Sequence, residues 1–110
     1  MSTLRNKVSL IGHVGNQPEI ISLNSGKKIG KINLATNEVY YNEKGEKITE
    51  TQWHNVVAWG KTAEIIEKYV TKGKEIAIEG KLTHRSYDDK DGNKRYITEV
   101  VANDILLLGK

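Results

Sequence analysis

One segment with a helical period interrupts a chain whose remaining pattern is that of β-strands. Ala63, Ile66 and Val70 recur on one face of a helix predicted over residues 61–71, with Tyr69 beside them as a packing residue. Elsewhere β-branched and aromatic residues alternate with polar ones between turns that contain glycine. The pattern predicts a mainly β domain that contains a single α-helix.

The order of the predicted elements narrows the fold further. Strands are predicted at residues 7–14, 28–41, 51–60, 75–87 and 94–102, with residues 19–23 extended and a short apolar ending at residues 105–108. Three strands precede the helix and two follow it. This is the order of an OB-fold, a five-stranded Greek-key barrel with one helix between strands three and four. We therefore predict one OB-fold domain spanning residues 1–110.

Local signals support these boundaries. Thr62 is a predicted cap for the amino end of the helix, and Gly73 is a predicted stop. Gly12, Gly30 and Gly80 fall inside strands, where glycine commonly marks a bulge or a sharp bend. Small closed barrels need such bends.

The composition excludes several kinds of chemistry. The 110 residues include no cysteine, which excludes disulfides, thiolate zinc sites and cysteine nucleophiles. His13, His54 and His84 are far apart in sequence and lack the spacing of a zinc site. There is no glycine-rich phosphate loop and no dinucleotide-binding motif. We expect no catalytic residue, no metal and no cofactor.

The location of the protein follows from what the sequence lacks. No apolar run approaches the length of a membrane span, and no charged-then-apolar leader precedes the first strand. We expect a soluble intracellular protein with no membrane partner. Its net charge of +3 is too small to identify a partner by itself.

Two strands combine aromatic with basic or polar side chains. Because side chains alternate along a strand, one face carries Thr51, Trp53, Asn55, Val57 and Trp59, and another carries Lys81, Thr83, Arg85 and Tyr87. Unpaired bases stack on flat rings, and phosphates need cations nearby. These two faces predict a surface for single-stranded nucleic acid.

Several motifs resemble those of bacterial single-stranded DNA-binding proteins. They are NKVSLIGHVG at residues 6–15 with Pro18-Glu19, LATNE at 34–38, TQWHNVV at 51–57, KG at 72–73, IEGKL at 78–82 and DGNKRYITEVVA at 91–102. The resemblance covers nearly the whole chain in order. It implies an OB-fold, a homotetramer and binding of single-stranded DNA with little sequence preference. It also implies a cytoplasmic, nucleoid-associated role in DNA replication, recombination and repair.

The resemblance also assigns roles to individual residues. The family's base-stacking aromatic positions fall on Tyr40, Trp53, Trp59 and Tyr87, and its interface histidine falls on His54. Three of the four aromatic positions differ in residue type, but stacking requires only a π-face. A titratable His54 at a subunit interface would make assembly sensitive to pH near neutrality.

Phosphate contacts are predicted at cations that flank the aromatic strands or the matched motifs. They are Arg5, Lys7, Lys61, Lys72, Lys74, Lys81, Arg85 and Arg95. Tyr96, in contrast, is expected in the core or at an interface. Asp88, Asp89 and Asp91 could suggest a metal-dependent nuclease, but aspartates at a hairpin tip more often form a turn.

Two other functions remain open at this stage. Relatives in the family carry a flexible acidic tail that recruits replication and repair enzymes, whereas this chain stops at Lys110 without one. Partners bound through such a tail therefore cannot be carried over from the resemblance. A primosomal OB-fold adaptor that works through protein contacts is one alternative, although such relatives usually lack the full aromatic set. An RNA-binding OB module is the other.

Overall fold

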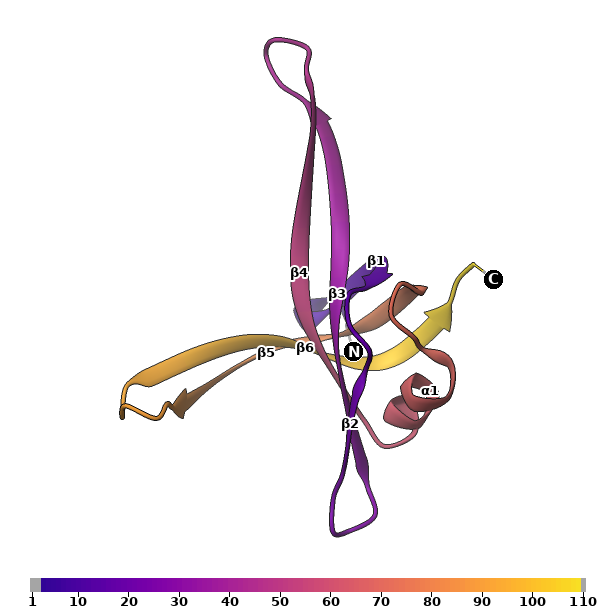
Figure 1. Cartoon of the computed structure of the whole chain (residues 1–110), viewed down its shortest axis with the longest axis vertical. Coiled ribbons are helices and arrows are strands. Elements are labelled where there is room, and N and C mark those ends of the chain that lie inside the picture. The colour runs from indigo at the N-terminus through magenta and orange to yellow at the C-terminus, as the bar shows by residue number, and fades with distance from the viewer. Residues whose placement is uncertain (1–2, 110) are drawn as a thin grey trace.

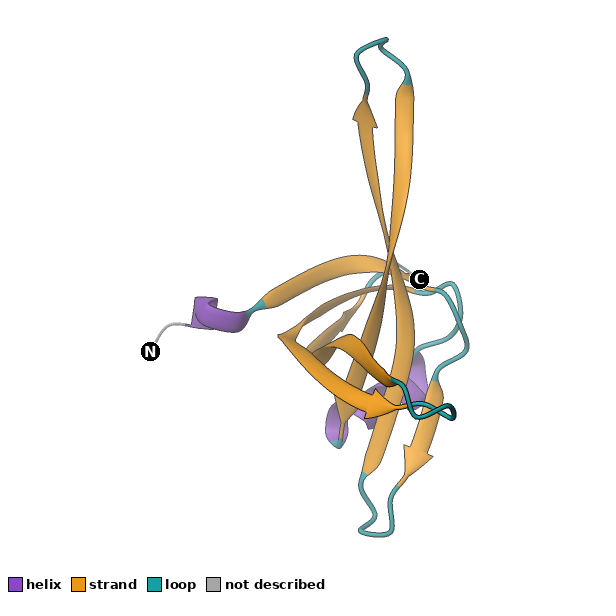
Figure 2. Ribbon diagram, turned by 90° about the vertical axis from the view of Figure 1, so that its left-hand side faces the viewer, coloured by secondary structure: helices purple, strands orange, loops and turns teal. Residues whose placement is uncertain are grey.

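The computed structural model, which describes residues 3–109, is a β-barrel from which three hairpins project (Figure 1). Its elements in chain order are η1 (Thr3–Asn6), β1 (Val8–Val14), β2 (Glu19–Ser22), β3 (Lys28–Tyr41), β4 (Lys47–Trp59), α1 (Lys61–Tyr69), β5 (Glu75–Asp88) and β6 (Lys94–Leu107). The β3–β4 and β5–β6 hairpins extend well beyond the barrel and point in different directions. Figure 2 shows η1 standing away from the barrel at its amino end.

Strand pairing closes the barrel. The order of the sheet is β1-β5-β6-β4-β3-β2, and β1 also pairs with β3. Only the β4–β6 pairing is parallel among the pairings of the described strands. Five strands thus form the closed barrel, and β2 lies outside it on β3. Because α1 falls between the third and fourth barrel strands, the predicted OB-fold is confirmed.

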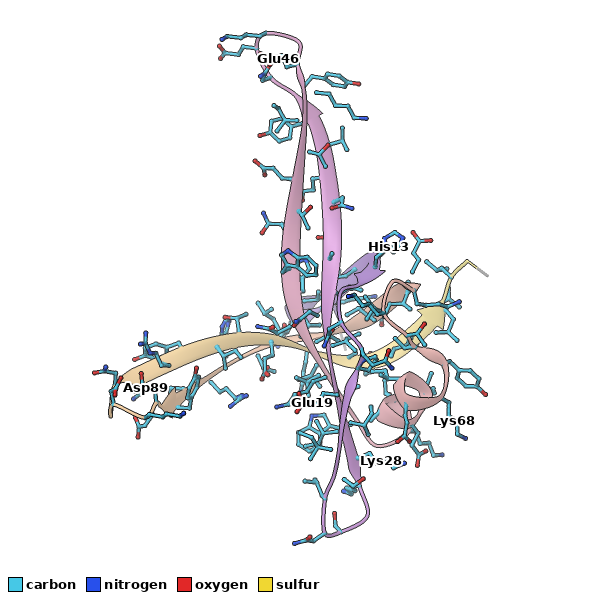
Figure 3. The ribbon with its side chains drawn as sticks, in the orientation of Figure 1. His13, Glu19, Lys28, Glu46, Lys68 and Asp89 are labelled. Atoms are coloured by element: carbon cyan, nitrogen blue, oxygen red, sulfur yellow. The ribbon has the colours of Figure 1, made fainter. Side chains whose placement is uncertain are left out.

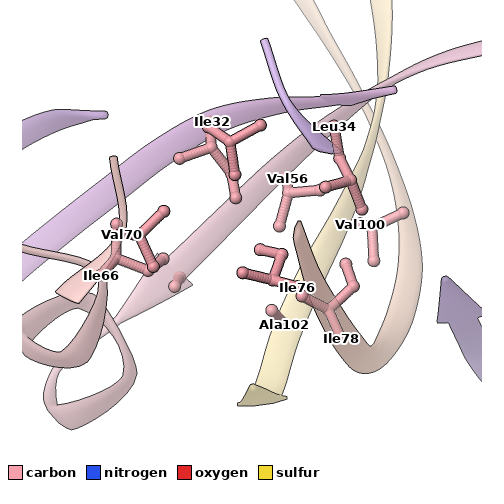
Figure 4. Packing of buried hydrophobic residues seen from close by; sticks show 11 residues of the cluster. Ile32, Leu34, Val56, Ile66, Val70, Ile76, Ile78, Val100 and Ala102 are labelled. Atoms are coloured by element: carbon pink, nitrogen blue, oxygen red, sulfur yellow. The ribbon is translucent and has the colours of Figure 1, made fainter. Parts of the chain in front are cut away.

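Alternating side chains of the barrel strands form the core (Figure 4). The cluster consists of Val14, Ile32, Leu34, Val56, Ala58, Ile66, Val70, Ile76, Ile78, Val100 and Ala102. Ile66 belongs to α1, and Val70 is the first residue after this helix. These two side chains pack against the strands at one end of the cluster. Burial of this apolar surface is the main force that holds the strands together.

Two strand glycines permit close approaches of the backbone. A Cβ atom at Gly12 would overlap the carbonyl oxygen of Ala35, where β1 passes from pairing with β5 to pairing with β3. A Cβ atom at Gly80 would overlap the carbonyl oxygen of Val101, and the register of β5 with β6 shifts between Glu79 and Gly80. The predicted bulge at Gly80 is therefore confirmed.

The ends of the helix differ from the prediction. The helix begins at Lys61 after Gly60 with no side-chain capping hydrogen bond, so the predicted cap at Thr62 is wrong. Thr62 lies inside the first turn, two residues after the cap position at Gly60. The helix stops at Tyr69 rather than Gly73, because Val70 adopts an extended conformation (φ −100°, ψ 126°) and joins the core.

Two strands are longer than their sequence pattern suggested. β4 begins at Lys47, before its predicted start at residue 51, and β6 continues through the predicted separate ending to Leu107, which pairs with Ile76. The added part of β4 lies outside the barrel, where both faces of a two-stranded ribbon meet solvent, so the alternation of apolar and polar residues that identifies a half-buried strand is absent there. The added part of β6 lies in the barrel, where Ile105 and Leu107 pack against the core.

Two tyrosines are more exposed than predicted. Tyr69 is 58% exposed, because the buried side of α1 is limited to Ala63 and Ile66. Tyr96 is 78% exposed, because it lies opposite Ser86 on the part of the β5–β6 ribbon that has left the barrel. Packing of Tyr69 and a core position for Tyr96 are both wrong. Within residues 3–109, no helix has the length and apolar character needed to cross a membrane.

Candidate nucleic-acid interface

The register of β3 with β4 fixes which side chains face outward. Trp53 is paired with Ala35, and Trp59 with Ile29. The neighbouring Val56 is in the core, so Trp53 and Trp59 lie on the outer side of the strand. Trp53 is 62% exposed and Trp59 is 50% exposed. Both rings are available to a ligand.

The β5–β6 ribbon continues the same surface. Arg85 is paired with Ile97, and Tyr87, which is 47% exposed, is paired with Arg95, all on the side opposite the core residue Val100. The parallel β4–β6 pairing joins the two ribbons. We call this surface the outer face and define it by Trp53, Asn55, Val57, Trp59, Lys81, Thr83, Arg85 and Tyr87. The structure therefore brings together the two residue sets that the sequence predicted.

A groove crosses the outer face where the two ribbons diverge. Its volume is about 210 Å³, and its lining includes Lys31, Asn33, Asn55, Val57, Arg85, Ile97 and Glu99. In Figure 3 the labelled Glu46 and Asp89 mark the distant tips of the two ribbons, whereas Glu19, which also lines the groove, lies near their common base. The groove is polar, with amide donors and acceptors from two paired strands.

Trp53 is positioned by a glycine. A Cβ atom at Gly15 would overlap the indole ring, so the ring lies directly over this residue. The loop beneath it is held by hydrogen bonds from Gly15 N to Asn33 O (2.8 Å) and from Asn33 N to Asn16 Oδ1 (2.9 Å). Trp53 is thus oriented on one side and exposed on the other, which suits a stacking platform.

A second cavity lies beside Trp59. It has a volume of about 380 Å³ and is lined by Trp59, Thr62, Lys81, Val101, Ala102 and Asn103. Lys81 is exposed and comes from β5, adjacent to β6 in the barrel. This cavity therefore combines an aromatic ring, on which a base can stack, with a cation that can contact a phosphate.

Tyr40 occupies the other side of the β3–β4 ribbon. It is paired with Ile48, five residues along β3 from Ala35, so it faces away from Trp53. Its hydroxyl donates a hydrogen bond to Glu50 (3.0 Å), which raises the pKa of Tyr40. Glu38 lies directly opposite Glu50. The structure therefore separates Tyr40 from the other three aromatic positions and surrounds it with carboxylates.

Lys7, Arg85 and Arg95, all predicted phosphate ligands, form ion pairs. Lys7 Nζ is 3.5 Å from Glu79, Arg85 Nε is 2.9 Å from Glu99, and Arg95 Nε is 2.8 Å from Asp89. The hydrogen bond to Glu99 raises the pKa of Arg85. These three cations are partly neutralised by the fold.

The remaining cations are spread over several elements. Arg5 lies in η1, Lys61 opens α1, and Lys72 and Lys74 lie between α1 and β5. Within the described part of the chain, no ion pair involves Arg5, Lys61, Lys72 or Lys81. Lys81 is the member of this group that belongs to the outer face.

His54 has a partner within its own chain. It is paired with Leu34 and half-buried, and its Nε2 atom lies 2.9 Å from Thr36 Oγ1. The hydrogen bond holds the ring on the side of β4 opposite Trp53. Its role at a subunit interface remains a prediction.

The aspartates after Tyr87 form a turn. Asp89 Oδ1 accepts hydrogen bonds from the backbone N–H groups of Asp91 and Asn93, both at 2.9 Å. The hydrogen bond from Arg95, together with these backbone donors, lowers the pKa of Asp89. The interpretation as a turn is confirmed. Across residues 3–109, no three histidine, cysteine, aspartate or glutamate side chains are placed to hold a metal ion.

Lys31, Asn33 and Glu99 line the groove but were not assigned a role from the sequence. Asn33 and Asn55 are paired across β3 and β4, and Lys31 is paired with Val57. Counting β3 in register with β4 could have identified Lys31 and Asn33. Glu99 lies opposite Thr83, in the part of the β5–β6 hairpin whose register follows directly from the turn, so the same counting could have placed it on the face of Arg85.

The closed barrel and the aromatic outer face define the class: an OB-fold domain with a surface of the kind that stacks unpaired bases. The model of the single-strand binding protein family matches residues 5–108. The chain belongs to this family.

Individual relatives agree with this assignment. The chain is 47% identical over 105 residues to single-stranded DNA-binding protein 1 of Chlorobaculum tepidum, covering 94% of this chain and 65% of that protein. It is 40% identical to single-stranded DNA-binding protein 1 of Xylella fastidiosa, covering 96% of this chain and 78% of that protein. The chain thus spans about two thirds of the length of the Chlorobaculum relative.

A solved structure shares the fold over its full length. The Plasmodium falciparum SSB complex with ssDNA superposes with a TM-score of 0.90 at 31% sequence identity, covering 99% of each chain. Both the sequence and the architecture therefore place the chain in the same family.

Proposed function

We propose that the protein binds single-stranded DNA with little sequence preference and coats it during replication, recombination and repair. The proposal involves no catalysis and no cofactor. A neighbour of the same fold is a complex with single-stranded DNA, and bacterial relatives are named for this activity.

The observation that carries the proposal is the composition of the outer face. Trp53, Trp59 and Tyr87 are exposed on one continuous surface, around a polar groove and beside Lys81. Stacking of a base on an aromatic ring contributes about 1–3 kcal/mol and tolerates every base, because each base has a π-face. Cations add a salt-dependent contribution from phosphate neutralisation.

Tyr40 remains a proposed stacking residue, but its contact with DNA depends on the path of the strand. Because Tyr40 faces away from Trp53, one nucleic-acid strand meets both rings only if it passes round the β3–β4 ribbon. A strand that wraps around the protein would meet this condition.

Assembly into a homotetramer is part of the same proposal, with His54 at a subunit interface. The outer side of β1, β5 and β6 exposes Ile11 and Leu106, which flank Ala77 in one row across the three strands. Exposed apolar patches of this kind mark interaction surfaces. The proposed location is the bacterial cytoplasm, in association with the nucleoid.

A tryptophan-fluorescence titration with oligo-dT at two salt concentrations tests the proposal. We expect quenching that saturates at a defined site size, because bases stack on Trp53 and Trp59, and binding that weakens as salt rises. Absence of both quenching and binding would contradict the proposal and favour the adaptor function. Competition by an oligo-U of equal length separates DNA binding from RNA binding.

A further inference from the structure

Glu99 is the charged residue most fully covered in the described part of the chain. It is 8% exposed and lies on β6, opposite Thr83. The two carboxylate oxygens accept hydrogen bonds from Arg85, at 2.9 Å from Nε and 3.4 Å from Nη2. This pair lies at the groove, on the surface proposed to bind DNA.

Glu99 occupies the side of the Arg85 guanidinium group that a DNA phosphate would otherwise bind. The Nε and Nη2 groups of arginine form a fork that binds two anionic oxygens at once, whether these belong to a carboxylate or to a phosphate. A DNA phosphate that approaches Arg85 along this fork therefore competes with Glu99.

The difference in burial decides this competition. Removing one partner of a buried ion pair leaves the other charge without compensation. The free-energy cost of that change is larger than the free energy gained from one exposed contact between charges. Within residues 3–109, the hydrogen bonds that the Glu99 carboxylate accepts come from Arg85. The Arg95–Asp89 pair differs, because Asp89 would keep two backbone N–H donors if Arg95 left.

We propose that Glu99 withholds Arg85 from DNA and thereby sets the affinity of the outer face below its maximum. The inference rests on the proposed function of this face. It revises the prediction for Arg85: in the wild-type protein its fork binds Glu99 rather than phosphate. Glu99 is an internal competitor for the DNA backbone.

The Glu99→Gln variant tests this by oligo-dT titrations over a range of salt concentrations. Glutamine keeps the size of the side chain and one acceptor but removes the competing charge. We expect binding about fivefold tighter and a log–log salt slope steeper by about 0.7, the value of one additional phosphate contact on a single strand. Glu67→Gln is the matched control. Glu67 lies on α1, away from the outer face, and forms a 2.6 Å ion pair with Lys28 of β3. The Glu67→Gln change should alter affinity by less than about twofold.

Arg85→Gln separates direct competition from a general change of charge. In the Glu99→Gln background Arg85 contacts phosphate, so its loss should weaken binding by about threefold more than its loss from wild type. Equal losses within about twofold would overturn the inference. So would Glu99→Gln binding no tighter than wild type or no tighter than Glu67→Gln.

A measurement on the wild type covers the case in which Glu99→Gln does not fold. The Arg85 Nε–H resonance, assigned through Arg85→Gln, should not move as oligo-dT is added, whereas a large shift would overturn the inference. If wild type does not bind oligo-dT, both this inference and the proposed function are overturned. If it binds and only the Glu99 result fails, the proposed function stands.

Discussion

Gly15 shows how a single backbone position sets the geometry of the proposed stacking site. The Trp53 ring lies over Gly15 because no side chain occupies that space, and hydrogen bonds to Asn33 and Asn16 fix the loop beneath it. The fold therefore orients the ring before DNA arrives, which reduces the entropy lost on binding.

We predict that Gly15→Ala weakens oligo-dT binding without unfolding the protein. The new methyl group would displace the Trp53 ring, an end of a side chain that can rotate away. The expected loss is several-fold, measured by fluorescence titration, with circular dichroism to verify folding.

Gly12→Ala is the contrasting variant. There the methyl group would meet the carbonyl oxygen of Ala35, which is backbone and cannot rotate away. We expect a lower melting temperature for Gly12→Ala and a normal one for Gly15→Ala. Unchanged binding by a folded Gly15→Ala protein would mean that the position of the ring over Gly15 is not important.

At the level of the elements, the two long ribbons determine which aromatic residues can act together. Trp53 and Tyr40 lie on the same hairpin but on opposite sides, since Tyr40 is five positions along β3 from Ala35, the partner of Trp53, and an odd offset changes the side. A sequence match assigns both residues to one site, whereas the register assigns them to two faces.

This difference predicts that the effect of Tyr40→Ala depends on oligonucleotide length. With oligo-dT of about 8 nucleotides, within the range for one OB-fold, we expect unchanged affinity, because such a strand covers the outer face alone. With an oligonucleotide several times longer, we expect a loss. A loss of equal size at both lengths would place Tyr40 in the same subsite as Trp53.

The tip of the β5–β6 ribbon carries a pH-dependent contact. Arg95 and two backbone donors lower the pKa of Asp89 below its ordinary value of 3.8. Asp89 therefore stabilises the folded state above pH 3.8, and this stabilisation is lost as pH falls through the lower pKa of the folded state.

Asp89→Asn should accordingly lower the melting temperature at pH 7. The difference from wild type should shrink as pH falls from 3.8 through the lower pKa of the folded state, because the stabilisation that the charge provides is lost over that range. Thermal melts at pH 7 and pH 3 measure this, with Asp91→Asn as the control. A difference that is the same at both pH values would show that the charge of Asp89 is not the cause.

The sequence predicted element types better than their extents. The five barrel strands and the helix follow from periodicity, because each buries one face in the core. The outer part of β4 buries neither face, so its pattern did not reveal it. The end of β6 was predicted as a separate segment, because the polar pair Asn103 and Asp104 interrupts its apolar pattern. The aromatic sets were also predictable from alternation, but the groove between them was not. It depends on closure of the barrel, which brings β3 and β4 beside β5 and β6.

At the scale of the whole molecule, a row of exposed apolar side chains marks a candidate surface for self-association. Ile11 and Leu106 are both more than 60% exposed and flank Ala77 on the outer side of β1, β5 and β6. They border a cavity of about 480 Å³. Self-association would remove this surface from water.

We predict a homotetramer in solution, and a smaller assembly for Ile11→Glu. A charge at the exposed end of the row would have to be desolvated on assembly, which is unfavourable without a partner charge. Light scattering coupled to size-exclusion chromatography measures both masses. A wild-type dimer would favour the adaptor function. An Ile11→Glu protein with the same mass as wild type would exclude this row from the interface.

The affinity of Trp53→Ala for oligo-dT, compared with that of Tyr69→Ala, tests the central claim most directly. Both residues are exposed aromatics, but Trp53 lies on the outer face and Tyr69 on α1. We predict that Trp53→Ala binds at least about fivefold more weakly, the equivalent of the lower limit for one stacked base. Tyr69→Ala should bind like wild type. Unchanged affinity for a folded Trp53→Ala protein, or an equal loss for Tyr69→Ala, would contradict the assignment of DNA binding to the outer face.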